Sequence, residues 1–226
     1  MDLLSKYDDQ LIDAFWITIK LTAASAICAL IIGTILAGMR VSPIPVARWI
    51  GAAYVTVFRN TPLTLIIIFC LFVLSQTLHV NLAREDSPTF LVDNNFRLAV
   101  LGLSVYTAAF VCESLRSGIN TVPVGQAEAG RSLGLTFFQN LRLIVLPQAF
   151  RAVIAPLGSV LIALTKNTTI ASVIGVAEAS LLMKTMIENE AAIFAVGGIF
   201  AAGFVCLTLP MGYLFGWLSQ RYRVAQ

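Results

Sequence analysis

Long apolar stretches separated by short polar segments dominate the pattern of this chain. Five of these stretches approach or exceed the roughly 20 apolar residues that a membrane-spanning helix needs. They cover about residues 14–39, 59–80, 96–116, 149–177 and 191–218. The pattern therefore predicts an all-α integral membrane protein with about five transmembrane helices, forming a single transmembrane domain over residues 1–226.

The segment 120–148, between the third and fourth stretches, is too polar to cross a bilayer but carries helix signals. Pro123 fits the first turn of a helix, where its missing N–H would be unpaired anyway. Gly134 can end the same helix in a left-handed conformation, with Leu135 beyond it. We therefore predict a short capped helix over residues 123–134, followed by a second amphipathic piece that ends at Leu146 and Pro147.

The composition supports a membrane protein and argues against several other classes. Of 226 residues, 58% are hydrophobic and only 12% are charged, against about 25% charged in soluble domains. No basic run is interleaved with aromatic residues, so nucleic-acid binding has no support. The acidic N-terminal segment is unlike a secretory signal, so the first span is expected to be retained. The cysteines lack metal-ligand spacing and are interpreted as small buried side chains: Cys28, Cys70, Cys112 and Cys206.

The distribution of charge predicts the orientation of the spans. Short loops rich in Lys and Arg stay in the cytoplasm. The segments 40–58 and 116–151 and the C-terminal tail contain many arginines and one acid, Glu128; the arginines are Arg40, Arg48, Arg116, Arg131, Arg142, Arg151, Arg221 and Arg223. The other segments collect the acids. This predicts the N-terminus outside, the C-terminus in the cytoplasm, and the segment 120–148 facing the cytosol.

Residues for enzymatic chemistry are scarce. No glycine-rich phosphate loop ending in Gly-Lys-Ser or Gly-Lys-Thr occurs, so the chain is not expected to hydrolyse nucleotide by itself. His79 is the only histidine and is interpreted as an interfacial residue. We therefore expect no catalytic residues and no metal site.

Lys166 is the most informative charge, because it lies within the fourth apolar stretch beside Asn167, Thr168 and Thr169. Ionisable residues at membrane depth are costly and often mark a ligand or ion path. The polar interruption is expected to break the helix, so that Thr168 and Thr169 cap a second half-helix whose N-terminal end favours an anion. In the alternative, Lys166 pairs with carbonyls or with an acid on a neighbouring span.

Two further sites have two interpretations each. Arg59 and Thr61 precede the second span, where Thr61 fits the cap and Pro62 the first turn. Arg59 either lines a pathway or anchors that helix at the inner interface. Glu113 and Arg116 lie three residues apart and form either a local ion pair or part of a gate.

The segment Glu128-Ala129-Gly130, with Gly134 and then Ile144, Leu146 and Pro147, resembles the EAA motif of ABC-importer permeases. In that motif, Glu-Ala-Ala is followed by three residues, Gly, nine residues and Ile-x-Leu-Pro. The spacing matches, and Gly130 in place of the second Ala is the one departure. Further segments are similar to the polar amino-acid branch: 59–63, 113–119, 122–126, 146–149, 166–169 and 172–176. Nearly the whole chain resembles actinobacterial glutamate-importer permeases, especially at 59–69, 89–120 and 161–183.

This resemblance implies a type I ABC importer permease fold in a bacterial cell membrane, with the 123–134 helix as a cytoplasmic coupling helix. The helix would insert into a groove on an ATPase through Gln126, Glu128, Ala129, Gly130, Ser132, Leu133 and Gly134. The implied partners are a second permease, either a copy or a homologue, two ATPase subunits and an extracytoplasmic amino-acid-binding protein. This chain would hold no cofactor, since ATP and Mg²⁺ bind the ATPase.

The resulting hypothesis is a permease subunit that carries glutamate or a related acidic or polar amino acid. Its expected pathway residues are Arg59, Thr61, Lys166, Asn167, Thr168 and Thr169. One alternative is a secondary carrier or channel that needs no ATPase and would have no use for a capped cytosolic helix; five spans also suit inverted repeats poorly. Another is a membrane scaffold, which would not need Lys166 at membrane depth.

Overall fold

The structure, a computed structural model, describes residues 2–222; Arg223, counted in the charge pattern, lies outside them. Every regular element within this range is helical, which confirms the all-α prediction. In chain order the helices are α1 (Asp2–Val41), α2 (Pro45–Asn60), α3 (Leu63–Phe69), η1 (Cys70–Thr77), α4 (Phe90–Asn120), α5 (Val124–Ser132), α6 (Phe137–Asn140), η2 (Leu141–Val145), α7 (Leu146–Asn167), η3 (Thr168–Ile174), α8 (Ala179–Glu190) and α9 (Ile193–Arg221).

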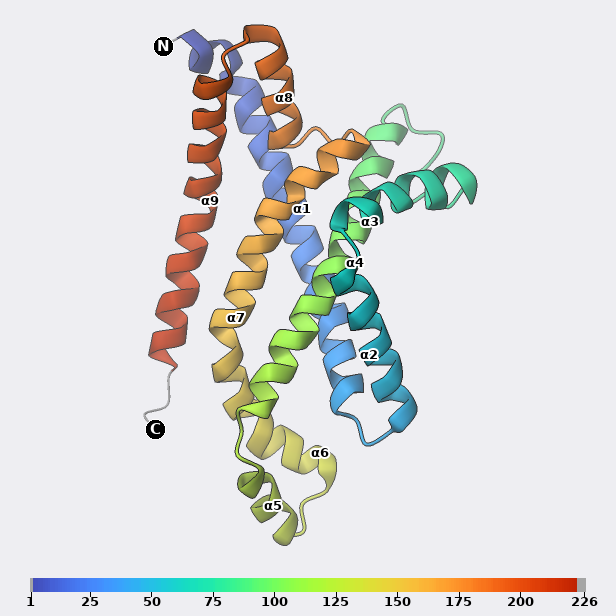
Figure 1. Cartoon of the computed structure of the whole chain (residues 1–226), viewed down its shortest axis with the longest axis vertical. Coiled ribbons are helices and arrows are strands. Elements are labelled where there is room, and N and C mark those ends of the chain that lie inside the picture. The colour runs from blue at the N-terminus through green and yellow to red at the C-terminus, as the bar shows by residue number, and fades with distance from the viewer. Residues whose placement is uncertain (1, 223–226) are drawn as a thin grey trace.

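Four segments of the described chain are single helices long and apolar enough to cross a membrane. They run side by side along the long axis of the molecule, and α5 and α6 protrude beyond them at one end (Figure 1). The start of α1 and the end of α9 lie toward opposite ends of this axis. The four segments are 3–41, 90–120, 137–174 and 193–221.

The fifth candidate span is bent, and most of the segment 40–58, for which a loop was predicted, is helical. Helix α2 already begins at Pro45, and together with α3 and η1 it forms a helix pair bent by 102°. The bend falls at Thr61, whose backbone is extended (φ −94°, ψ 130°). A residue before proline avoids the helical region, so Pro62 imposes this break. Thr61 does not cap α3; its hydroxyl donates to the Val57 carbonyl at 2.8 Å.

Glycines let the long helices approach closely. A Cβ on Gly33 of α1 would lie 2.6 Å from the Cβ of Val111 on α4, and a Cβ on Gly118 of α4 would lie 2.1 Å from Cγ1 of Val153 on α7. Small residues at helix interfaces allow such approaches in membranes, where dispersion contacts replace the hydrophobic effect. Buried side chains then join α1, α3, α4 and α7 in a central core, with Leu21, Ile67, Leu98, Leu103 and Leu164 among its members.

Helix α8 lies in a segment, 178–190, for which no helix was predicted. Glu178 precedes it, and its carboxylate accepts hydrogen bonds from the backbone N–H groups of Ser180 at 2.8 Å and Leu181 at 3.2 Å. This is a helix N-cap, but Glu is not among the residues preferred at that position, so the sequence gives little signal for the start of α8. The N–H of Ala179 donates to the hydroxyl of Thr18 at 3.2 Å, which attaches the start of α8 to α1.

The Glu178 side chain is completely buried. Burial raises the pKa of this carboxyl from 4.5 to about 7, against the opposing effects of its two backbone hydrogen bonds and of the Lys184 charge. The folded state therefore binds the Glu178 proton more tightly than the unfolded state does. Its contribution to stability is complete below about pH 4.5 and is lost as the pH rises through about 7.

We therefore expect Glu178→Gln, which has no titrating group at this position, to remove this part of the pH dependence. Between about pH 5 and about pH 8, the free energy of unfolding of the parent chain should fall by roughly 3 kcal/mol more than that of the variant. Chemical denaturation in detergent at the two pH values measures the difference. Glu188→Gln, at an exposed site on the same helix, is the control and should keep the parent slope. Equal slopes for parent and Glu178→Gln would contradict the interpretation.

Candidate functional site

The predicted helix in the segment 120–148 is present as α5, and its caps have the predicted form. Pro123 immediately precedes it, and Gly134 follows it with φ +80°, a left-handed conformation. The N–H of Gly134 donates to the Arg131 carbonyl at 2.9 Å, and the N–H of Leu135 donates to the Gly130 carbonyl at 3.2 Å. These two bonds form a Schellman motif, which satisfies carbonyls that would otherwise be unpaired at the helix end.

Hydrogen bonds attach α5 to the segment that follows it. The amide of Asn140 donates from Nδ2 to the Ala127 carbonyl at 2.6 Å, and the amide of Gln148 on α7 donates to the Gln126 side chain. A capping box between Thr136 and Gln139 starts α6. The spacing Thr-x-x-Gln is a recognised sequence signature of a helix start, although it was not used in the prediction. These contacts connect α5 directly to α6 and α7.

The second amphipathic piece does not end at Leu146 and Pro147, which corrects that prediction. Helix α6, the π-helical turn η2, α7 and η3 form one continuous helical segment over residues 137–174. A proline inside an α-helix removes one hydrogen bond and clashes with the carbonyl four residues earlier. The wider π-helical turn lies directly before Pro147 and changes this hydrogen-bond register, so the helix continues through the proline.

The expected docking residues of α5 divide into an outward and an inward group. Gly130 is the one buried residue of α5. A Cβ at this position would lie 2.7 Å from Cδ1 of Ile144 and 2.8 Å from Oδ1 of Asn140. The departure from the usual Glu-Ala-Ala sequence therefore serves packing within the chain. The remaining members of the set are exposed, Leu133 to 82%: Gln126, Glu128, Ala129, Ser132, Leu133 and Gly134.

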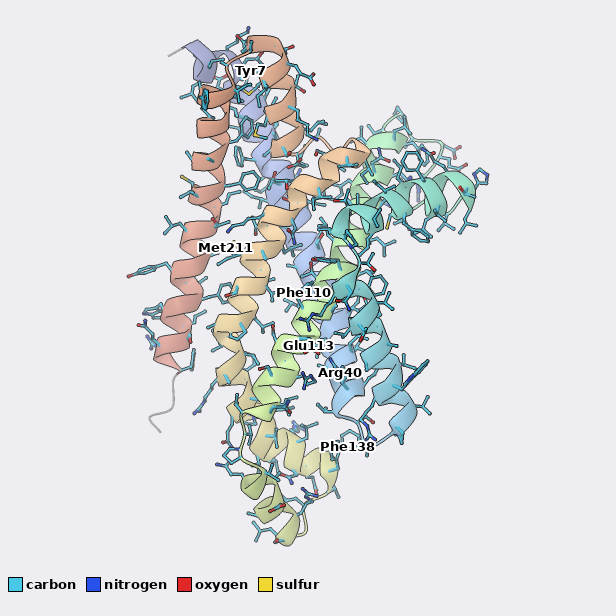
Figure 2. The ribbon with its side chains drawn as sticks, viewed as in Figure 1. Tyr7, Arg40, Phe110, Glu113, Phe138 and Met211 are labelled. Atoms are coloured by element: carbon cyan, nitrogen blue, oxygen red, sulfur yellow. The ribbon has the colours of Figure 1, made fainter. Side chains whose placement is uncertain are left out.

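A cluster of charges around Glu113 joins three helices. Its carboxylate pairs with Arg40 at the end of α1, with Arg116 on α4 at 2.9 Å, and with Arg59 at the end of α2 at 3.6 Å. The predicted pair of Glu113 and Arg116 is thus confirmed, and it is part of a larger group. Figure 2 shows Arg40 and Glu113 close together, with Phe110 further along α4. Arg40, Arg59 and Glu113 also line a cavity of about 300 Å³.

Phe110 connects the two sets of predicted pathway residues. The guanidinium of Arg59 lies 5.6 Å from the centre of the Phe110 ring, a cation–π distance. Phe110 also lines a cavity of about 250 Å³ between α4 and α7, to which Asn167 contributes. Lys166, next to it, is exposed. Phe110 therefore lies near both Arg59 and Asn167, although these two residues are far apart in the sequence.

The region around Lys166 corrects the prediction of a broken helix. Helix α7 tightens at Thr168 into the 3₁₀-helix η3 without a gap, so no second helix N-terminus forms. The backbone N–H of Thr168 is bonded to the Leu164 carbonyl. The hydroxyls of Thr168 and Thr169 donate to the carbonyls of Thr165 at 2.7 Å and Lys166 at 2.8 Å. Thr168 is fully buried, so neither threonine caps a half-helix.

We expect Glu113→Gln to destabilise the chain by roughly 3 kcal/mol, because three arginines then lose the carboxylate that they share. Arg40→Gln added to Glu113→Gln should cost less than Arg40→Gln alone, since the two residues are coupled. Chemical denaturation in detergent measures all four chains of this cycle. Glu188→Gln, an exposed acid outside these ion pairs, should change the stability by less than about 0.5 kcal/mol. Additive effects of the two substitutions would contradict the shared-carboxylate interpretation.

Sequence comparison with known proteins shows the family to which this chain belongs. Residues 29–224 match the family described as binding-protein-dependent transport system inner membrane component. The glutamate transport system permease protein GluC of Corynebacterium glutamicum is 64% identical over 215 residues, which cover 95% of this chain and 94% of that protein. The glutamate/aspartate import permease protein GltK of Escherichia coli is 33% identical, with coverages of 93% and 92%.

Solved structures agree on the fold. A chain from the crystal structure of an amino acid ABC transporter with histidines superposes with a TM-score of 0.84 at 28% identity, covering 96% of each chain. A chain of the inward-facing MetNI methionine ABC transporter gives a TM-score of 0.76 at 17% identity, with coverages of 97% and 99%. These matches set aside the alternatives of a secondary carrier, a channel and a scaffold. The chain belongs to the binding-protein-dependent transport system inner-membrane component family and is a membrane-embedded permease subunit of an ABC importer.

Proposed function

We propose that this chain is one of two permease subunits of an importer for glutamate or a closely related acidic amino acid. The names of the relatives that are 64% and 33% identical support the substrate, since they are glutamate and glutamate/aspartate permeases. The second permease is a copy or a homologue of this chain. An extracytoplasmic binding protein delivers the amino acid, and two ATPase subunits bind ATP and Mg²⁺.

The positive residues favour an orientation with α5 in the cytosol, the N-terminus outside and the C-terminus inside. Exposed arginines gather on α2 and on the elements around α5, and positive loops remain on the cytoplasmic side: Arg48, Arg131, Arg142 and Arg151. Each ATPase then contacts the exposed face of α5. This capped helix, exposed on one side and hydrogen-bonded to α6 and α7 on the other, is the observation that carries the proposed mechanism.

The α5 contact would work as a coupling joint. Closure of the ATPases on ATP moves the two α5 helices of the permease pair toward each other. Because α6 to η3 is one continuous helical segment, the motion reaches the part of the bundle that contains Asn167 and Lys166. Tilting of the spans then changes access from the cytosolic side to the outside, and hydrolysis reverses it. The docking set is Gln126, Glu128, Ala129, Ser132, Leu133 and Gly134, with Gly130 as the inward support.

Ala129→Trp tests the coupling helix. Ala129 is exposed, so the indole is compatible with the folded chain but holds the ATPase surface away from α5. We expect the purified permease to retain about tenfold less ATPase, since a clash in a packed interface costs more than about 1.4 kcal/mol. Thr185→Trp, at an exposed site on α8, is the matched control and should retain the parent amount. Undiminished co-purification of the ATPase with Ala129→Trp would rule out this docking face.

The substrate route is proposed to pass Lys166, Asn167 and Arg59. Lys166 and Arg59 are exposed cations on two different helices, and cations suit the carboxylates of an acidic amino acid. Thr61 lies at the bend next to Arg59, and Thr169 is partly exposed beside Lys166. Thr168 is buried, so its role in this proposal is to hold the backbone of η3 below Lys166.

Lys166→Met tests the route. A charged hydrogen bond to a carboxylate contributes about 1.5–3 kcal/mol, so its loss should lower glutamate uptake at least about tenfold. Uptake is measured in proteoliposomes that contain the assembled importer and its binding protein, and co-purification of the ATPase checks assembly. Lys20→Met replaces another exposed lysine, on α1, and should leave uptake near the parent level. Equal uptake by parent and Lys166→Met would remove Lys166 from the pathway.

A further inference from the structure

Two neighbouring cavities lie at the end of the bundle that carries α5. The first has a volume of about 640 Å³ and lies between α1, α4, α5 and α6. Three arginines line it: Arg40 from the last turn of α1, Arg116 from α4 and Arg131 from α5. The same cavity includes apolar side chains of α1, α4 and η2. We call it the arginine cavity.

The arginine cavity has an excess of positive charge. Arg40 and Arg116 share one carboxylate, that of Glu113, which also pairs with Arg59. Arg131 is exposed and pairs with no acid in the described part of the chain; its Nε donates to the Ala127 carbonyl at 3.4 Å. A guanidinium without an acidic partner suits phosphate, which its fixed fork of donors can bind through two hydrogen bonds.

The second cavity, of about 720 Å³, is apolar and is formed by one face of α1 against α4 and α7. Its α1 residues recur at helical spacing and extend over about 10 Å along the helix, from Val41 toward the middle of the span. They are Thr34, Ala37, Gly38 and Val41. Leu115, Ile119, Phe150 and Val153 are among those that face them. We call it the apolar cavity.

The two cavities adjoin, because Val41, Ile119 and Leu141 line both of them. The arginine cavity lies where the apolar part of α1 ends at Arg40, which is the depth of lipid headgroups. The apolar cavity extends from there into the span. A charged compartment at the interface that continues into an apolar groove matches the chemistry of a phospholipid, and basic pockets between transmembrane helices are known to hold anionic headgroups.

We propose that this pair of cavities binds one anionic phospholipid, with its phosphate among Arg131, Arg40 and Arg116 and one acyl chain in the apolar cavity. Neither Arg59 nor Lys166 lines either cavity, so the site is separate from the proposed substrate route. The lipid fills the space between α5 and the ends of α1 and α4. It therefore bears on the same region that would pass ATPase motion to the spans.

The binding of phosphatidylglycerol and of phosphatidylcholine with identical acyl chains tests the site. The assembled importer is purified in detergent, titrated with each lipid, and bound lipid is counted by native mass spectrometry. Both lipids have a phosphate, but the choline cation of phosphatidylcholine would lie among the three arginines that line the cavity. Because like charges repel, phosphatidylglycerol should bind at least about tenfold more tightly, a difference of about 1.4 kcal/mol. Equal affinity for the two lipids would overturn the proposal.

Two variants separate the headgroup from the acyl chain. Arg131→Gln should weaken the binding of phosphatidylglycerol and reduce its preference over phosphatidylcholine, because the cavity loses a phosphate donor and one positive charge. Arg142→Gln, an exposed arginine that lines neither cavity, is its control and should behave as the parent. Gly38→Leu should reduce binding of both lipids, because nothing lies within 4 Å of a Cβ at Gly38 and the side chain fills the cavity. Gly197→Leu on α9, at an equally open position, is the matched control.

Three results would count against the site. Parent-like preference for phosphatidylglycerol in Arg131→Gln would show that the phosphate is held elsewhere. Loss of binding in Arg131→Gln with no effect of Gly38→Leu would indicate an anion site without a lipid chain, and displacement of the lipid by soluble glycerol phosphate would agree with that result. Oxidative cross-linking of Gly38→Cys to a cysteine of the second permease chain would show that protein fills the apolar cavity.

Discussion

The charges around Glu113 are the constraint on which the arrangement of the bundle depends. One carboxylate holds Arg40, Arg59 and Arg116, so the end of α1, the end of α2 and the C-terminal part of α4 are fixed to one point. The bend at Thr61 makes this possible, because it ends α2 early enough for Arg59 to reach α4. Ion pairs join specific groups in specific directions, so this cluster positions the three helices more precisely than apolar packing in a lipid environment does alone.

The same point connects the bundle with its two surfaces of interest. Arg59 lies near the Phe110 ring, and this ring lines the cavity to which Asn167 contributes. Arg40 and Arg116 line the arginine cavity beside α5. In the proposed mechanism, a displacement of α5 and a displacement near Asn167 would act on ion pairs that share one acid. Two sites that act on one set of contacts are coupled whenever those contacts differ between states of the protein.

Much of the fold could be predicted because it depends on apolar length and local capping. The long spans and the caps of α5 follow from residues such as Pro123 and Gly134, whose conformational effects are local. The errors arose where a local signal permits two conformations or where distant residues meet. Pro62 was correctly placed at a helix start, but it could not indicate that α2 forms a helix directly before the bend. Thr168 and Asn167 resemble a helix break, yet η3 continues because the threonine hydroxyls bond to carbonyls of their own helix. The grouping of Arg40 with Glu113, 73 residues away, has no local signal.

Gly130 has a consequence for how permeases of this kind vary. Its missing side chain accommodates Ile144 and Asn140, so the residue at position 130 is chosen by the chain's own α6 and η2. If α5 were replaced by that of a relative with alanine at this position, the added methyl group would clash with residues 140 and 144 unless these were replaced as well. The exchangeable unit is the hairpin from Pro123 to Gln148, since its two arms are matched to each other before they meet any other subunit.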